Sequence, residues 1–217
     1  ALVFTGGDYS DGGDDIRNTL DKYGIKAGFF FTGDFYRDSS NWGLIKNLKE
    51  AGHYLGPHSD QHLLYCSWQA RDSLLVTRAE FKKDLVDNYK IMKKFGIERK
   101  DAVYFIPPYE WYNARIVDWA KAMGVVLFNF TPGTLSNADY TTPEMDNYRA
   151  SKEIYKSILD YEESSKNGLN GYILLIHIGS SPKRKDKFYY NLDEIITTLR
   201  NKGYKFIRID QLLENCE

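Results

Sequence analysis

Short apolar runs alternate with longer amphipathic stretches from one end of the chain to the other. Runs rich in β-branched and aromatic residues predict seven strands, at residues 1–5, 27–32, 53–57, 103–106, 125–130, 172–178 and 204–208. Helical periodicity between the runs predicts helices near residues 13–23, 41–51, 78–96, 113–123, 149–166 and 190–202. Several of these helices end in a glycine, as at Tyr23-Gly24, which is typical of a helix that closes before a strand.

This alternation indicates an α/β fold with parallel strands joined by right-handed crossovers. Seven such units favour a distorted (β/α) barrel with about seven parallel strands over an open sheet. No repeat, low-complexity tract or linker divides the 217 residues, so we expect a single domain over residues 1–217. In such a barrel, functional side chains lie on the loops that follow the carboxyl ends of the strands.

Charge and hydropathy argue against two classes of partner. The chain has 29 Lys and Arg residues against 30 Asp and Glu residues, so it lacks the excess of positive charge that nucleic-acid binding usually needs. No apolar stretch approaches the roughly 20 residues of a membrane helix, so no membrane span is expected. The chain opens directly on an apolar run, which leaves open a leader or an upstream domain, and with it a larger multidomain protein.

Two of the four histidines, His58 and His62, lie four residues apart just after the third predicted strand. On one side of a helical turn, two imidazoles at this spacing reach a single divalent cation. The same spacing also arises by chance, but its position at a strand end favours a metal site. Cys66 and Cys216 show no CxxC spacing, which excludes a cysteine metal site.

The glycine-rich loop after the first strand, residues 4–13, supplies two candidate carboxylates, Asp8 and Asp11. One of them would complete a His-His-carboxylate site with positions left open for water and substrate. The other would take a proton from water. An alternative is that the loop is an ordinary turn before the next helix.

His177 lies at the carboxyl-terminal tip of the apolar run 172–178 and is followed by a glycine. That position is expected of a group that faces the mouth of an active site. A lone histidine among apolar residues is more often a buried structural residue, and this alternative stays open. His53 lies at the opposite end of its strand, so we expect it to be structural.

Aromatic side chains follow the strand predicted at 103–106. Two prolines stiffen this loop, and Tyr109, Trp111 and Tyr112 come directly after them. Packing alone accounts for one such aromatic, whereas three favour a wall for a sugar chain. The aromatic content of 15% agrees with this interpretation, since Tyr and Trp have apolar faces and polar edges.

The motifs resemble, over essentially the whole chain, the polysaccharide deacetylases of carbohydrate esterase family 4 (the NodB-homology domain). That family's metal-binding H-[S/T]-x-x-H motif, preceded by a GH-x-x-G strand, matches residues 52–62, which read GHYLGPHSDQH. Its late L-x-H motif matches Leu175-Ile176-His177, which implies a general-acid role for His177. The chain is identified as a divergent member, because three other motifs differ.

The chain differs from the family in the first, third and fourth motifs, and the first of these normally provides the proton acceptor. The family's first motif has two adjacent aspartates, a base and a metal ligand, where this chain has Gly6-Gly7. We favour Asp8, nearest the strand tip, as the ligand and Asp11 as the base, and the opposite order is also open. The arginine of the third motif is replaced by Ile106, and the tryptophan-bearing fourth motif is not recognisable at residues 129–132.

The resemblance implies a metal-dependent hydrolase that removes N- or O-acetyl groups from a polysaccharide or oligosaccharide. It implies one divalent metal ion, with zinc expected first and nickel or cobalt as alternatives. It also implies a secreted, periplasmic or cell-surface location and a role at the cell envelope. The alternative is a catalytically weak or inactive carbohydrate-binding relative that keeps the metal site. A glycoside hydrolase using Glu110 and Asp139 would leave the histidine pair unexplained.

Overall fold

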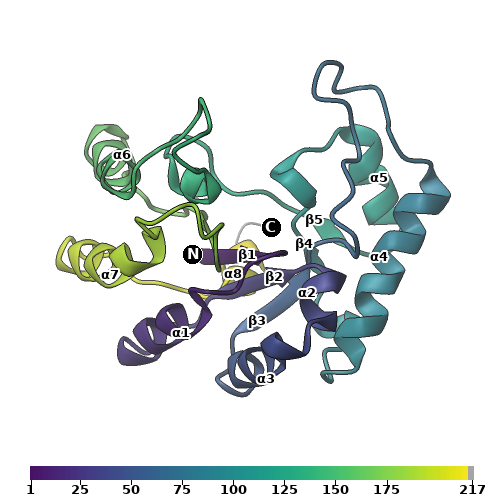
Figure 1. Ribbon diagram of the computed structural model, residues 1–217, viewed down its shortest axis with the longest axis horizontal. Helices are drawn as coiled ribbons and strands as arrows, with labels where there is room; N and C mark the ends of the chain where they lie inside the picture. The colour runs from purple at the N-terminus through teal and green to yellow at the C-terminus, as the bar shows by residue number, and fades with distance from the viewer. Residues whose placement is uncertain (215–217) are drawn as a thin grey trace.

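A four-stranded parallel sheet runs through the centre of the computed structural model, which describes residues 1–214 (Figure 1). Cys216 lies outside the described residues. In spatial order the strands are β3 (Tyr54–Pro57), β2 (Gly28–Phe31), β1 (Leu2–Gly6) and β6 (Leu174–His177). A separate parallel pair is formed by β4 (Tyr104–Phe105) and β5 (Val126–Leu127).

Helices surround these strands. In Figure 1, α6, α7 and α1 lie on one side of the strands, and α4 and α5 lie on the other. The helices are α1 (Gly13–Lys22), α2 (Gly33–Arg37), α3 (Trp42–Glu50), α4 (Arg78–Lys93), α5 (Ala114–Ala122), α6 (Ser151–Ser164), α7 (Leu192–Asn201) and α8 (Ile209–Glu214). Within residues 1–214, none of them is long and apolar enough to cross a membrane.

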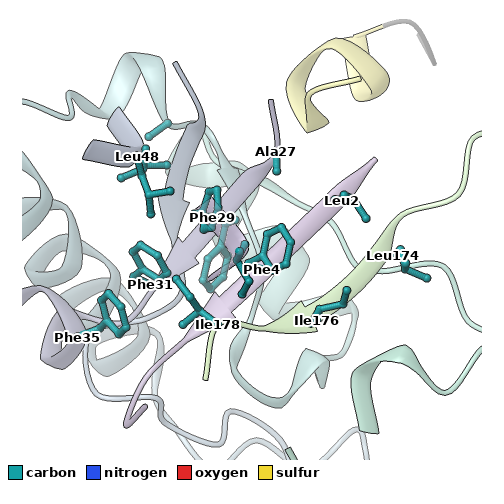
Figure 2. Close-up of a cluster of buried hydrophobic side chains, with 14 of the residues drawn as sticks. Leu2, Phe4, Ala27, Phe29, Phe31, Phe35, Leu48, Leu174, Ile176 and Ile178 are labelled. Atoms are coloured by element: carbon teal, nitrogen blue, oxygen red, sulfur yellow. The ribbon is translucent and has the colours of Figure 1, made fainter. Parts of the chain in front are cut away.

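The central strands are apolar because both of their faces are covered. Phe4 stacks on Phe29 with ring centroids 5.0 Å apart in one core cluster, part of which Figure 2 shows. Val3 and Phe30 belong to a second cluster. Side chains alternate between the two faces of a strand, so continuous apolar runs are required where both faces are buried.

The strand predicted at residues 204–208 does not form. Six of the seven predicted strands form, but residues 204–208 pair with no strand in the described part of the chain. Exposed Lys205 and Ile207 alternate with the half-buried Tyr204 and Phe206. The alternation of period two is therefore real, but it comes from an irregular segment that lies along the core and has no neighbouring strand.

Candidate active site

The carboxyl ends of the four central strands lie together at one edge of the sheet. The register pairs Thr5 with His177, Gly6 with Phe31, and Phe31 with Pro57. The loops beyond these positions surround a cavity of about 1010 Å³. Of the predicted site residues, the cavity is lined by Asp8, His58, His62, Tyr109 and His177.

His58 is fixed in one orientation. Its Nδ1 lies 2.9 Å from the carbonyl oxygen of Ile106, and its backbone N–H donates to Oδ1 of Asn88 at 3.0 Å. A carbonyl oxygen only accepts, so Nδ1 carries the proton and Nε2 keeps its lone pair. Burial and the charge of His62 hold the pKa of His58 well below its ordinary value, so the ring is neutral.

The helical turn expected at residues 58–62 is wrong. These residues form a loop, in which Ser59 and His62 have positive φ angles of 73° and 54°. Oδ1 of Asp84, on α4, accepts hydrogen bonds from the N–H groups of Asp60 and Gln61 at 3.2 and 3.0 Å. The loop still brings the rings of His58 and His62 to a centroid distance of 5.0 Å.

The two imidazoles suit a divalent cation. Burial and the charge of His177 lower the pKa of His62 to about 4, so both rings are neutral and able to donate lone pairs. Asp8 lines the same cavity, and its charge acts on His62. Within residues 1–214, however, no group of three His, Cys, Asp or Glu side chains is arranged to hold a metal. Two histidine nitrogens are therefore suited to binding a metal ion, and a third ligand is not already in place.

Asp11, the expected base, does not line this cavity. Its Oδ1 accepts from the N–H of Ser180 at 2.9 Å, and its Oδ2 accepts from the Tyr189 hydroxyl at 3.0 Å and pairs with Lys187 at 2.8 Å. Asp11 lines a smaller neighbouring hollow. Burial acts to raise the pKa of Asp11, but these three partners outweigh it and hold that pKa below its ordinary value. An engaged carboxylate of this kind is a weak proton acceptor.

Gly6 and Gly7 differ in the room around them. A Cβ on Gly6 would lie 2.7 Å from Cγ2 of Ile178 and 2.8 Å from Cδ1 of Phe31, so the packed core excludes a side chain there. A Cβ on Gly7 would come no closer than 3.7 Å, to Cγ2 of Thr32. Space for a carboxylate at the tip of β1 therefore exists at Gly7 and not at Gly6.

His177 is held by a carboxylate. Its Nδ1 lies 2.6 Å from Oδ1 of Asp139, and its backbone N–H donates to Oδ2 of the same residue at 2.8 Å. Within the described residues, Nε2 of His177 has no hydrogen-bond partner. Burial acts to lower the pKa of His177, but the charge and hydrogen bond of Asp139 and the charge of Glu110 outweigh it and raise that pKa above its ordinary value. His177 therefore has a carboxylate on one ring nitrogen and, among the described residues, no partner on the other.

His53 is buried, as expected of a structural residue. Its Nδ1 accepts a hydrogen bond from the N–H of Ala27 at 3.1 Å. Burial and the charge of Lys26 lower the pKa of His53 to about 4. It is therefore a neutral ring that joins β3 to β2 away from the cavity.

Of the three aromatic side chains predicted to form a wall, only one lines the cavity. Tyr109 lines the cavity, and its ring centroid lies 4.4 Å from that of His62. Trp111 and Tyr112 do not line it. The Arg71 guanidinium covers their rings at 4.3 and 5.5 Å, and its Nε donates to the carbonyl oxygen of Tyr112.

Trp68 takes the place expected of Trp111. It lines the cavity, with its ring 5.6 Å from that of Tyr109 and 5.3 Å from that of Trp111. The side chains of Trp68 and Tyr109 are 51% and 45% exposed, so each offers a ring face to a ligand. The sequence signal for Trp68 was a tryptophan among polar residues in the loop after His62.

Glu110 is a second cavity residue that we had not placed with the histidines. Its backbone, like that of Tyr109, has a positive φ, and its carbonyl oxygen accepts from Nδ2 of Asn129 at 2.9 Å. Within residues 1–214, its carboxylate makes no hydrogen bond or ion pair. Burial raises the pKa of Glu110 to about 7, with the charge of His177 opposing this rise and that of Asp139 adding to it.

The fold and the cavity define an α/β protein whose candidate chemistry lies beyond the carboxyl ends of parallel strands. A model of the polysaccharide deacetylase family matches residues 1–128, more than half of the chain. The chain therefore belongs to the polysaccharide deacetylase family, which confirms the resemblance seen in its motifs.

Three known proteins illustrate the relationship. A peptidoglycan-N-acetylglucosamine deacetylase of Bacillus cereus is 26% identical over 200 residues, 91% of this chain and 80% of that protein. A family 4 acetyl xylan esterase of Clostridium thermocellum, solved with a cobalt ion, matches 99% of this chain and 89% of its own, with a TM-score of 0.75 and 21% identity. A family 4 pseudoenzyme of Bacillus anthracis matches 98% of this chain and 64% of its own, with a TM-score of 0.74 and 19% identity.

These structural likenesses confirm the predicted fold class, the distorted (β/α) barrel of carbohydrate esterase family 4. Other curated relatives are longer, and the chain spans 65% of one and 38% of another. The family includes a structure with a bound divalent metal and also a pseudoenzyme. Membership alone therefore does not decide whether this chain is active.

Proposed function

We propose that the chain is a metal-dependent hydrolase that removes acetyl groups from an acetylated polysaccharide or oligosaccharide. The single observation that carries the proposal is the His177–Asp139 pair on the cavity that His58 and His62 also line. A histidine held by a carboxylate, with its other nitrogen unpartnered, is suited to donating a proton.

His58 and His62 would hold the metal, with Asp8 as the third ligand. Zinc is the first choice for nitrogen and oxygen donors, and nickel or cobalt is an alternative. When bound, the ion supplies polarisation of the acetyl carbonyl and a lower pKa for water. Ile106 and Asn88 contribute by fixing the orientation of His58 before any ion arrives.

His177 would protonate the leaving group. Asp139 accepts from Nδ1, which leaves the proton on Nε2 of the charged ring for the departing nitrogen or oxygen of the sugar. The raised pKa of His177 keeps the charged form available near neutral pH. Trp68 and Tyr109 would stack on sugar rings beside the acetyl group.

We propose an N-acetylated cell-wall glycan as the first substrate to test, since the B. cereus relative is a peptidoglycan-N-acetylglucosamine deacetylase. Such a substrate implies a secreted, periplasmic or cell-surface location. The chain would then be one domain, residues 1–217, of a larger multidomain protein. The greater length of other relatives supports this.

A second candidate function is glycan binding without turnover. The glycines at the tip of β1 and the engaged carboxylate of Asp11 favour it, because both remove an expected proton acceptor. The aromatic wall would serve a binding protein equally well.

Acetate release and glycan binding, measured on the same preparation, separate the two. The panel is peptidoglycan fragments, acetylated chito-oligosaccharides and acetylated xylan, each with zinc, nickel or cobalt present. A hydrolase releases acetate from at least one of them. Saturable binding with no acetate from any substrate under any of the three metals would favour the binding relative.

A further inference from the structure

The proposed hydrolysis requires a proton acceptor that the first loop does not provide. Asp11 is engaged outside the cavity, and Asp8 is assigned to the metal. The remaining carboxylates on the cavity are Asp34, Glu110 and Glu144. Asp34 pairs with Arg37 at 2.8 Å, and Glu144 pairs with Lys183 at 2.9 Å. Glu110 is therefore the remaining carboxylate without a cation among the described residues that line the cavity.

The backbone at Glu110 is held in an unusual conformation. Tyr109 and Glu110 have φ angles of 59° and 52°, a left-handed pair at positions that are not glycine. Such residues carry strain and persist only where surrounding contacts impose them. Here the N–H of Glu110 donates to the carbonyl oxygen of Pro107 at 3.0 Å, and Asn129 holds the Glu110 carbonyl. These contacts hold the backbone of Glu110 at the wall of the cavity that His177 also lines.

We propose that Glu110 is the general base of the deacetylation, an inference that rests on the proposed hydrolase function. Its carboxylate takes one proton from water while the water oxygen bonds to the acetyl carbon and the carbonyl π pair moves onto oxygen. Collapse of that intermediate breaks the bond from carbon to the sugar nitrogen or oxygen. The leaving atom takes the proton of His177, and acetic acid departs. A proton passes from Glu110 to His177 through solvent, which restores both groups.

The charges around Glu110 suit this role. Two titratable groups from other elements act on it, His177 at the end of β6 and Asp139 in the turn at Ser136–Tyr140. Burial gives Glu110 a pKa of about 7, close to the value at which proton transfer is most effective at neutral pH. The carboxylate is charged above that pH and protonated below it.

The test is acetate release by Glu110→Gln, with Glu163→Gln, an exposed glutamate of α6 outside the cavity, as the matched control. Glu110→Gln should lower kcat by about 10²-fold or more, at unchanged metal content and thermal midpoint. It should also remove the fall in wild-type kcat/KM as pH drops through about 7. Glu163→Gln should keep turnover within about fivefold, because Glu163 lies outside the cavity and its exposed ion pair with Lys202 is worth little.

A second variant separates the loss of a proton acceptor from a structural effect of the substitution. In Glu110→Ala, added formate should raise turnover, since a small carboxylate replaces the missing acceptor. An active wild type with Glu110→Gln inside fivefold of it would overturn the base assignment alone. So would a folded Glu110→Ala protein whose turnover formate does not raise. No acetate from the wild type on any substrate would overturn the hydrolase proposal itself.

Discussion

At the scale of single residues, the site depends on which nitrogen and oxygen atoms already have partners. Nδ1 of His58 is bound to Ile106 and Nδ1 of His177 to Asp139, so each ring has one nitrogen left for the cavity. Asp11 has partners on both carboxylate oxygens. The two histidines therefore each keep one ring nitrogen that can act in the cavity, whereas the carboxylate of Asp11 is already hydrogen-bonded at both oxygens.

The role of His177 is tested by His177→Ala. We expect acetate release to fall by about 10²-fold or more, the usual contribution of a proton donor, while metal content stays unchanged. The measurement compares both proteins at matched metal loading. Turnover within a few-fold of the wild type would remove His177 from the mechanism.

The pairing with Asp139 predicts a pH effect. Asp139→Asn removes the charge that raises the pKa of His177, so that pKa should fall. A general acid works only while protonated, so the high-pH decline of kcat/KM should move to lower pH. A profile of wild type, Asp139→Asn and the control Asp146→Asn measures this. An unshifted decline in Asp139→Asn would contradict the assignment.

At the scale of elements, helix α4 shapes the loop that carries the histidine pair. Oδ1 of Asn88 accepts from the N–H of His58, and its Nδ2 donates to the carbonyl oxygen of Phe31 on β2. Asp84, one turn earlier, fixes Asp60 and Gln61. The unusual φ angles in this loop are therefore maintained from a neighbouring helix.

Asn88→Ala tests this support. It leaves two buried backbone groups unpaired, which should lower the free energy of unfolding by about 1–3 kcal/mol. Metal affinity should fall by about 10- to 100-fold, as for other residues that orient a ligand. Urea unfolding and metal titration measure the two effects. The control Asp87→Ala removes a half-buried α4 side chain that pairs with the exposed Lys83 and Lys90, and it should lower the free energy of unfolding by about 1 kcal/mol at most. An equal loss of unfolding free energy and of metal affinity in both variants would contradict the role of Asn88.

The aromatic wall makes a separate prediction. Trp68→Ala should weaken oligosaccharide binding by about 1 kcal/mol, or roughly fivefold in Kd, because an exposed ring face is lost. Titration of chito-oligosaccharide into the folded variant measures this. Trp42→Ala, an exposed tryptophan on α3, should bind as the wild type does. Unchanged affinity in Trp68→Ala would place the glycan elsewhere.

At the scale of the whole molecule, local sequence patterns predicted most of the strands and the positions of the histidines. Contacts between residues far apart in the sequence determine which side chains are free at the cavity. Five of the strands, β1, β2, β3, β4 and β6, were predictable because burial leaves a direct apolar pattern, whereas β5 was predictable from its apolar residues although Val126 is exposed. The positions of His58, His62 and His177 on the cavity were predictable because His177 ends β6 and the other two follow the end of β3. The position of Asp11 outside the cavity was not predictable, because the Tyr189 hydroxyl, 178 residues away in the sequence, donates to its carboxylate. The same holds for Asp139, whose loop meets His177 only through tertiary packing.

The central claim is that a divalent metal at His58 and His62 enables this chain to release acetate. The most direct measurement is acetate release by chelator-stripped protein titrated with zinc, nickel or cobalt, alongside the His58→Ala/His62→Ala double variant. The account predicts that turnover rises with bound metal to about one ion per wild-type chain, and that the double variant neither retains metal nor releases acetate. Metal retained by the double variant at wild-type stoichiometry, or acetate release that does not depend on metal, would contradict it.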